Sequence, residues 1–541
     1  MKTETLPEQA VAAMPERPAV NPWLFVPLLY VMQAIPVTIV QEVATYFYKD
    51  LGIANEPITR WTSLIALPWS LQMLLGPLVD LNFTKRWWTL TGQAACAAGL
   101  IATGFLIKAP HAFELSLVIL GATAIVSALC NIATDGFYIL SMTKDQQAKF
   151  VGVQTTCYRL GRLFCIGILV QFAGKLAKGG MNQMTAWAVV LGACGAIYLL
   201  GHLIGRVAVP RPLADHPAEA QEPTENRRNV YRTLAIVALG LGGYFAMNSL
   251  VRLGAHGLWL ALDGSPTGKL GGWMLAPEAD LFGIPMPGIT AELVQLAVSG
   301  AVTVFAYIEA RRTIVKTPMG EAFASFVRQP GIVPIFFFIL FYRFGEAMVS
   351  KMSPLFLKDA VANGGLAIAN DQLGVVKGYF GVAGIVLGGI VGGVVVGKWG
   401  LRRSILPLAI CMHAPNLLYL MLATTKVPLN YVGLGPYFGQ VPLTLVGVDF
   451  VDQFGYGFGF AAYMVFIMYV AQRGRFQTAH MAIGTGAGAL CIAVAGIVSG
   501  IIQANFGYPA FFISVIFFSL PGLITLFFIP IDDGRSAPSV A

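Results

Sequence analysis

Fourteen stretches of mostly apolar residues divide this chain of 541 residues, and no other feature limits its fold so strongly. An α-helix of about 20 apolar residues crosses the hydrocarbon core of a bilayer. Only 11% of the residues are charged, against about 25% in an ordinary soluble domain. We therefore predict an all-α polytopic membrane protein with spans at residues 23–48, 60–80, 87–108, 113–142, 149–176, 184–207, 232–251, 289–309, 331–357, 373–397, 402–424, 441–471, 476–504 and 508–530.

Lysine and arginine residues indicate the orientation of these spans. With the N-terminus in the cytoplasm, 21 of the 35 Lys and Arg residues fall on the inner side and 9 on the outer side. This asymmetry follows the positive-inside rule, so the net charge of +8 indicates topology rather than nucleic-acid binding. We expect a multi-pass protein of the cell inner (plasma) membrane with both termini cytoplasmic.

The spans fall into groups of six, two and six. The stretch 252–288 is too polar to span and is expected to form a long outer loop, whose role does not follow from the sequence. The expected domains are a cytoplasmic tail (1–22), an N-terminal six-helix bundle (23–208), a cytoplasmic linker (209–231), a two-span insert (232–330), a C-terminal six-helix bundle (331–530) and a cytoplasmic tail (531–541).

Short sequence echoes relate the two groups of six. "YFYKDLG" (46–52) is matched by "LFLKDAV" (355–361), and both place Lys-Asp at the outer end of a first span. "GPLVDLNFTKRWW" (76–88) is matched by "GGVVVGKWGLRRS" (392–404), and both join a second span to a third. Parallel repeats of six spans with a substrate path between them are typical of the major facilitator fold. The predicted architecture is that fold, with two six-helix bundles plus two extra central helices.

Both basic turns resemble the loop pattern G-x-x-x-D-(R/K)-x-G-x-(R/K)-(R/K) of the major facilitator superfamily. The first keeps the acid, Asp80, whereas the second has Gly397 in its place. An acid that faces basic residues and helix ends can form a cytoplasmic latch; alternatively, the basic residues only set the topology. The predicted gate residues are Gly76, Asp80, Lys85, Arg86, Gly393, Lys398, Arg402 and Arg403.

Four further motifs resemble the AmpG-type permeases, which include bacterial muropeptide permeases. They are "LPWSLQMLLGPLVD" (67–80), "ATDGFYILSM" (133–142), "FYRFGEAM" (341–348) and "VDQFGYGFGFAAYMVFIM" (451–468). The resemblance covers both groups of six spans. It implies the major facilitator fold and proton-driven import of anhydro-sugar peptides.

Ionisable residues within spans are the candidates for proton coupling, because a charge at mid-bilayer costs at least ~2.5–3.5 kcal/mol. Glu42 and Glu346 occupy equivalent spans of the two halves, so both are expected to face a central cavity, and this pair leads the candidates. Asp135 and Asp452 are the other two. Asp452 matches an acidic position of the family; the alternative is a water-facing acid at the outer mouth.

Two pairings within the membrane are left open by the sequence. Arg343 precedes Glu346 by three residues on one helix face. Either the acid takes a proton and the arginine holds an anionic substrate, or the two neutralise each other. Asp135 is expected to lie near Arg159 and to form with it a structural or a proton-switched lock.

Other polar residues of the spans are candidates for substrate binding. Lys351 and Lys377 either attract anions or extend to the membrane interface, and the second reading is favoured. At one candidate position, Gln72, muropeptide permeases usually carry Lys. The predicted substrate-binding residues are Arg159, Arg343, Gln41, Gln72, Tyr138 and Tyr342.

The predicted function is proton-coupled uptake of a small solute, such as a cell-wall sugar-peptide or a sugar, by alternating access. The alternatives are an uncoupled facilitator or exporter, or a membrane assembly or signalling factor that does not transport. An enzyme is not expected, because no loop is long enough for a soluble domain. No metal or cofactor is expected, because the seven cysteines lie in apolar stretches without CxxC spacing. The expected partners are protons, a small-molecule substrate and lipid, without nucleic acid, and the protein is expected to act as a monomer.

Overall fold

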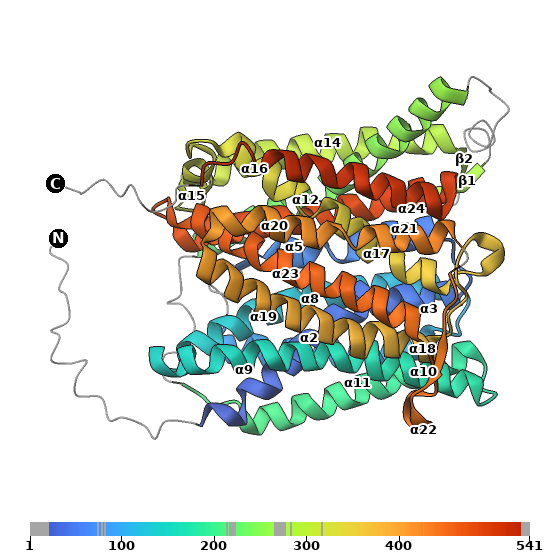
Figure 1. Cartoon of the computed structure of the whole chain (residues 1–541). Helices are drawn as coiled ribbons and strands as arrows, with labels where there is room; N and C mark the ends of the chain where they lie inside the picture. The colour runs from blue at the N-terminus through green and yellow to red at the C-terminus, as the bar shows by residue number, and fades with distance from the viewer. Residues whose placement is uncertain are drawn as a thin grey trace, which may run out of the picture.

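The computed structural model describes residues 21–72, 75–76, 79, 83–212, 215, 223–263, 277–281, 284–314, 318–425 and 427–531. Long helices run side by side along one axis (Figure 1). Two antiparallel β-hairpins lie at one end of the bundle, on the right in Figure 1, and we call this the hairpin end. They are formed by β1 (Pro277–Leu281) with β2 (Ile284–Pro287) and by β3 (Tyr431–Gly433) with β4 (Gln440–Pro442).

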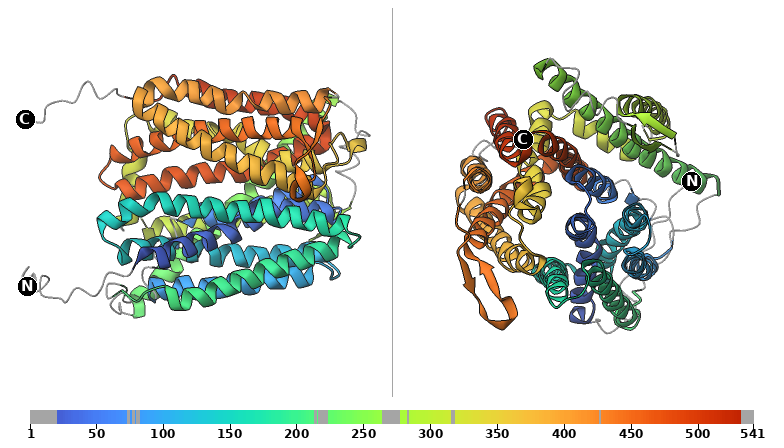
Figure 2. Two further views of the ribbon diagram at one scale, coloured as in Figure 1. Left: turned by 60° about the horizontal axis from the view of Figure 1, so that its bottom comes forward. Right: turned by 90° about the vertical axis from the view of Figure 1, so that its right-hand side faces the viewer.

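The chain divides into two groups of helices with an insert at their outer edge, where the green helices lie in the right panel of Figure 2. The N-terminal half comprises η1 (Pro22–Leu24), α2 (Val26–Thr38), η2 (Ile39–Val43), α3 (Ala44–Asp50), α4 (Asn55–Ile65), α5 (Leu67–Ser70), α7 (Lys85–Leu106), α8 (Ala112–Ser141), α9 (Lys144–Leu163), η3 (Phe164–Leu169), α10 (Val170–Lys178) and α11 (Gln183–Ala208). The insert comprises α12 (Pro223–Asp263), β1, β2, α14 (Gly288–Ile314) and α15 (Pro318–Val327). The C-terminal half comprises α16 (Ile332–Phe341), α17 (Phe344–Lys358), η4 (Val361–Asn363), α18 (Asn370–Leu373), η5 (Gly374–Gly381), α19 (Val382–Trp399), α20 (Leu401–His413), α21 (Asn416–Thr424), β3, α22 (Gly435–Phe438), β4, α23 (Leu443–Gln472) and α24 (Gln477–Thr525).

Among the described residues, 11 helices are long and apolar enough to cross a membrane, whereas the sequence predicted 14 spans. The predicted span 60–80 is interrupted at Ala66, between α4 and α5, and Pro68 lies in the first turn of α5, where its missing backbone N–H is tolerated. The predicted spans 476–504 and 508–530 both occur as helices within α24, which is divided into two by a kink at Gly507 (φ 78°), so this predicted boundary is confirmed. The predicted span 232–251 lies inside the much longer α12.

The predicted outer loop 252–288 begins later than expected, because α12 continues to Asp263. Arg252, expected in that loop, is buried in α12, where its guanidinium lies 2.9 Å from Glu292 of α14 and 3.4 Å from Glu56 of α4. Tyr244 of α12 also donates a hydrogen bond to a backbone carbonyl of α4, that of Arg60. These buried polar contacts fasten the insert to the N-terminal half.

Three spans contain π-helical segments, namely η2, η3 and η5. A π turn adds a residue to a helix and changes which side chains face a given direction; such turns are frequent at functional sites. Pro36, three residues before η2, lacks a backbone N–H and so removes one regular hydrogen bond from the end of α2. The π segments contain or adjoin Glu42, Arg162 and Lys377, three of the charged residues described below.

Among the described residues, the largest buried apolar cluster joins the two halves at the hairpin end, whereas neither cluster near the opposite end combines the two halves. One large buried cluster contains Phe47 of the N-terminal half together with Phe356 and Phe512 of the C-terminal half. Two other clusters lie toward the opposite end; one belongs to the N-terminal half, and the other combines the C-terminal half with Phe326 of the insert. The described conformation is therefore packed shut at the hairpin end and divided at the other.

Glycines allow the two halves to approach closely at the hairpin end. A Cβ atom at Gly378 of η5 would overlap the backbone of Gly167 of η3. Within the C-terminal half, Gly384, Gly388 and Gly392 of α19 lie against the backbone of α23. The small-residue stripe in this span thus serves close helix contact, as is common in membrane proteins.

We expect Gly378→Ala to destabilise the closed hairpin end. The added methyl group meets backbone atoms, and overpacking of this kind costs typically about 1–3 kcal/mol. Gly393→Ala is the matched control, because a Cβ atom there has no neighbour within 4 Å among the described residues, and alanine favours a helix. The melting temperature of purified protein should fall for Gly378→Ala only, and equal melting of the two variants would contradict the assigned contact.

A strap formed by β3, α22 and β4 reaches from the C-terminal half to the N-terminal half at the hairpin end. Gln171 of α10 donates a hydrogen bond to the carbonyl of Tyr437 over 3.0 Å. The hydroxyl of Tyr437 lies 2.8 Å from that of Tyr379, and its ring lies 4.1 Å from the ammonium of Lys175. The sequence did not predict this strap, because residues 425–440 are only a short gap between two spans.

Candidate functional site

The two halves enclose a cavity of about 470 Å³, which we call the central cavity. Its wall contains charged, polar and aromatic side chains of both halves, among them Gln41, Glu42, Tyr46, Trp69, Tyr158, Arg162, Arg343, Glu346, Ser350, Lys351, Lys377 and Tyr456. A second pocket of about 620 Å³ shares Tyr158, Arg162 and Tyr456 with it and extends to Tyr30 and Asp135. The two pockets therefore adjoin and lead from between the halves toward the end opposite the hairpins.

Glu42 and Arg162 form a bidentate ion pair in the wall of the central cavity. Nε and Nη2 of the guanidinium lie 2.9 and 3.1 Å from the two carboxylate oxygens. Glu42 belongs to η2, and Arg162 is the last residue but one of α9, just before η3, so the pair lies at two π segments. Parallel N–H···O bonds of this kind fix both geometry and charge. Glu42 thus faces the cavity with its charge already matched.

Glu346 also lines the central cavity, but without a partner. Its side chain is 1% exposed, and neither carboxyl oxygen accepts a hydrogen bond from a described residue. It sits in the first turn of α17, just after the chain breaks helical form at Tyr342 and Arg343. Burial of an unpaired carboxylate is costly, and binding a proton relieves that cost. The site therefore favours reversible protonation of Glu346.

Arg343 does not neutralise Glu346 by an ion pair, although the sequence left that pairing open. Its guanidinium donates to the hydroxyl of Tyr456 over 2.7 Å and lies 4.8 Å from the ring of Phe460. The helix break between α16 and α17 turns it toward α23, where a cation over aromatic faces is favourable. The expectation that both residues share one regular helix face is wrong.

A buried ion pair between Lys377 and Asp449 lies beside Glu346. The ammonium is 2.5 Å from the carboxylate, and it also donates to the hydroxyls of Ser353 and Tyr419. The favoured expectation that Lys377 extends to the membrane interface is therefore wrong. Asp452, one helical turn beyond Asp449, is 1% exposed, so it is not the water-facing acid of the alternative reading.

Asp135 and Arg159 both line the second pocket, but they are not paired with each other. Asp135 accepts hydrogen bonds from the hydroxyl of Tyr30 at 3.0 Å and the amide of Gln33 at 3.5 Å. Arg159 instead approaches Gly389 of the other half, and its Nη1 has no hydrogen-bond partner among the described residues. The expected lock between Asp135 and Arg159 is absent from this conformation.

The side chains of three predicted substrate-binding residues make hydrogen bonds to backbone carbonyls of the protein. Gln72 donates to the carbonyl of Ala128, Tyr138 to that of Gln147, and Tyr342 to that of Gly459. None of the three lies in the wall of either described pocket. Of the other predicted residues, Gln41 and Arg343 line the central cavity, whereas Arg159 lines the second pocket.

The first basic turn is held by an acid that the sequence did not single out. Backbone N–H groups of Lys85 and Arg86 donate to the two carboxylate oxygens of Asp215 in the linker, over 2.6 and 2.9 Å. Asp80, the predicted acid of the latch, lies outside the described residues; Gly76, close before it, is half-buried. The second turn is exposed at Gly393, Lys398, Arg402 and Arg403.

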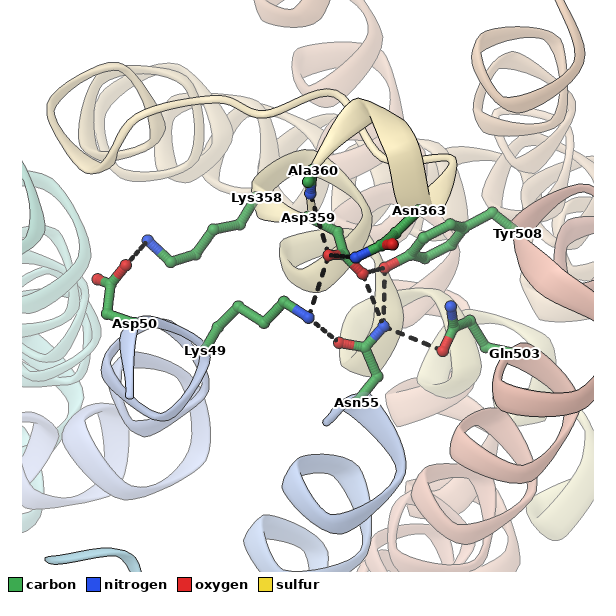
Figure 3. A network of polar contacts seen from close by, with 9 residues as sticks. All are labelled: Lys49, Asp50, Asn55, Lys358, Asp359, Ala360, Asn363, Gln503 and Tyr508. Atoms are coloured by element: carbon green, nitrogen blue, oxygen red, sulfur yellow. Dashed lines mark hydrogen bonds and ion pairs between the residues drawn. The ribbon is translucent and has the colours of Figure 1, made fainter. Parts of the chain in front are cut away.

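Reciprocal ion pairs link the halves at the hairpin end, and we call them the clasp (Figure 3). Lys49 of the N-terminal half lies 3.2 Å from Asp359 of the C-terminal half, and Lys358 lies 2.6 Å from Asp50 in return. Each Lys-Asp dipeptide is one of the duplicated motifs of the sequence. The sequence showed the repeat, but only the packing of the halves shows that each copy pairs with the other.

Neutral side chains also hold the two acids of the clasp. Asp359 accepts hydrogen bonds from the amide of Asn55 at 3.1 Å and the hydroxyl of Tyr508 at 3.0 Å. Asp50 accepts from the indole of Trp187 and the amide of Asn370, both at 2.7 Å. Both acids are thus satisfied by charge and by hydrogen bonds, so the clasp stabilises the closed hairpin end.

We expect the Lys49–Asp359 half of the clasp to persist until strongly acidic pH. Burial acts to raise the pKa of Asp359, but hydrogen bonds from Asn363 and Asn55 and the charge of Lys49 outweigh it and hold that pKa below its usual range. A lowered folded-state pKa gives stability that is present above the unfolded pKa of about 3.9 and is lost as pH falls through the folded one. Asp359→Asn should lower the melting temperature equally at pH 7 and pH 5. A difference that shrinks over this interval would contradict the assignment.

Comparison with known proteins finds similarity to one family profile and to proteins named as transporters. The family profile described as the BT1 family matches residues 37–248. The chain is 25% identical over 195 residues to the putative transporter AmpG 1 of Rickettsia prowazekii, covering 36% of this chain and 40% of the relative. It is 23% identical over 209 residues to an uncharacterized protein of Haemophilus influenzae, covering 38% and 46%. The chain thus matches less than half the length of these relatives.

Solved structures match along nearly the whole chain. The peptide transporter POT in complex with sulfate has a TM-score of 0.59 at 13% identity, covering 96% of this chain and 98% of that one. A mutant of the nucleoside transporter NupG has a TM-score of 0.53 at 13% identity, covering 94% and 98%. Identities this low show the fold, and the relatives with a named role are transporters rather than enzymes. This chain has the predicted major facilitator fold, which it shares with these solved transporters, and over part of its length it is similar to AmpG-named proteins.

Proposed function

We propose that this protein is a secondary transporter that couples uptake of a small solute to entry of protons by alternating access. The observation that carries the proposal is Glu346, a buried carboxyl without a hydrogen-bond partner in the wall of a cavity between two halves. A group in this position gains a proton at low cost and holds it away from water. The relatives named as transporters support the same class of function.

The proposed orientation puts the hairpin end outside the cell and both termini in the cytoplasm, within the inner (plasma) membrane. The excess of Lys and Arg residues on the side of the termini supports it. In this orientation the described conformation is closed outward by the clasp and the shared apolar cluster, and its pockets lead inward. It is the state from which solute and proton would be released.

The proposed solute is a sugar or sugar-peptide, in line with the resemblance of the sequence motifs to AmpG-type permeases. The central cavity supports this size class, because about 470 Å³ is in the ordinary range for small-molecule sites. Aromatic side chains in its wall, including Trp69 and Tyr46, offer apolar faces for a sugar ring. Protons would bind at Glu346, in the C-terminal half, whereas the ion pair of Glu42 with Arg162 lies within the N-terminal half.

Purified protein in lipid vesicles tests the coupling. Uptake of anhydro-sugar peptides and of simple sugars is measured with and without an inward proton gradient. We expect the concentration of one of these solutes inside the vesicles to exceed its external concentration only when the gradient is present. A protonophore should abolish this accumulation. Uptake that merely equilibrates, with or without the gradient, would identify an uncoupled facilitator instead.

A further inference from the structure

Lys351 is a buried cation without a partner in the wall of the central cavity. It lies on α17, and its side chain is 7% exposed. Its ammonium makes no hydrogen bond or ion pair with a described residue. The favoured sequence-based expectation, that it extends to the membrane interface, is wrong, because α17 directs it between the two halves rather than toward lipid.

The other cations of this wall are occupied. Arg162 is held by both oxygens of Glu42, Lys377 by Asp449, and Arg343 by a hydroxyl and the aromatic rings of α23. Glu42 is the charged group that interacts electrostatically with Lys351, but it is already committed to Arg162. Among the lining cations that the structure describes, Lys351 is therefore the one without an ion-pair or hydrogen-bond partner.

A buried charge without a counter-charge is costly and persists where function requires it. We propose that Lys351 binds the anionic group, a carboxylate or a phosphate, of the transported solute. Ser350, its neighbour on α17, and Gln41 across the cavity offer further polar atoms for the rest of the solute. The site lies in the cavity assigned above to transport, so this inference rests on the proposed function and names its substrate class.

The position of Lys351 also suits proton coupling. Glu346 lies five residues earlier on the same helix and lines the same cavity. A solute anion at Lys351 and a proton at Glu346 enter together without adding net charge to a low-dielectric site. Charge balance of this kind removes the largest electrostatic cost of carrying an anion through the membrane.

The melting temperature of the purified protein without solute gives the first test. Lys351→Met keeps the length of the side chain and removes a charge that has no partner, so it should raise the melting temperature. Lys377→Met is the matched control, because it leaves Asp449 buried without its cation and should lower the melting temperature. If Lys351→Met also melts lower than the wild-type protein, Lys351 is a structural residue and the inference is wrong.

Solute binding gives the second test, with N-acetylglucosamine as the neutral scaffold. N-acetylmuramic acid adds a carboxylate to it, and N-acetylglucosamine 6-phosphate adds a phosphate, so the two anions distinguish the two sources of charge. We expect at least one of them to raise the melting temperature of the wild-type protein above the effect of the neutral sugar. This gain should be lost in Lys351→Met and retained in part in Lys351→Arg.

An equal gain in Lys351→Met, or no gain from either anion, would overturn the inference. Neither result depends on a proton gradient, because binding is measured in detergent. Gradient-driven uptake without a preference for anions would thus refute the role of Lys351 and leave the proposed function standing. A preference for anions without gradient-driven uptake would refute the coupling and leave Lys351 as the anion site.

Discussion

Vesicles that contain Glu346→Gln protein should fail to concentrate solute under an inward proton gradient. A gradient of one pH unit stores about 1.4 kcal/mol per proton, enough for about a tenfold accumulation by a carrier that moves one proton per solute. Glutamine has the shape of the protonated acid but cannot release a proton. The variant should therefore still exchange labelled for unlabelled solute across the membrane while its accumulation falls to unity.

Glu114→Gln is the matched control for this experiment. Glu114 lies exposed in the first turn of α8, away from both pockets, so its substitution should change neither accumulation nor exchange. Loss of exchange together with accumulation in Glu346→Gln would indicate a binding role for this carboxyl. Normal accumulation by the variant would show that the proton is carried elsewhere.

Reversal of one charge in the clasp should open the hairpin end. Asp359→Lys brings three lysines against Asp50 and removes the acceptor of the hydrogen bonds from Asn55 and Tyr508. Removal of one partner from a buried ion pair typically costs about 3–5 kcal/mol, and each 1.4 kcal/mol is about a tenfold shift in a two-state equilibrium. We expect the population that is open at the hairpin end to rise about tenfold or more.

A thiol placed in the central cavity measures this population. Ser350→Cys, in protein that also carries Cys411→Ser to remove an exposed native thiol, is treated from the hairpin side with a reagent that does not cross membranes. Labelling should be slow in the parent and fast with Asp359→Lys. Adding Lys49→Asp restores one opposite-charge pair and should slow labelling in part, since the neutral hydrogen bonds stay broken. Equal labelling of all three proteins would mean that the clasp does not hold this end shut.

The sequence predicted the membrane fold and the placement of Glu42 and Glu346 in the cavity. It predicted less well which partner each buried charged side chain contacts. The length of each apolar stretch reflects the free energy of transfer into lipid, so it predicted the membrane-spanning helices. The repeated motifs related the two halves, so they predicted the paired bundles and a cavity that contains Glu42 and Glu346. Partner choice depends on rotation about each helix axis, which regular periodicity misjudges where a helix contains π turns or a break. Arg343 turns away from Glu346 at such a break, and Lys377 lies inside a π segment next to Asp449.

Long-range pairs could not be read from neighbouring residues. Arg162 pairs with Glu42, which lies 120 residues earlier in the sequence, and Lys49 pairs with Asp359, which lies 310 residues later. The repeated Lys-Asp dipeptides were visible in the sequence, but their reciprocal pairing follows only from how the two halves pack against each other. A duplicated charged dipeptide at equivalent helix ends is thus a signal for an interdomain contact.

The strap has a consequence for how ionic strength affects the transport cycle. Opening the hairpin end must separate Tyr437 from Gln171, a neutral contact, as well as breaking the clasp. Dissolved ions weaken electrostatic attraction mainly between exposed charges more than about 8–10 Å apart, so they act on the buried ion pairs of the clasp only as these separate, and they act weakly on neutral hydrogen bonds. Added salt can therefore lower only the electrostatic part of the barrier to opening. The part due to the neutral contact of the strap remains at any salt concentration and limits the rate of turnover.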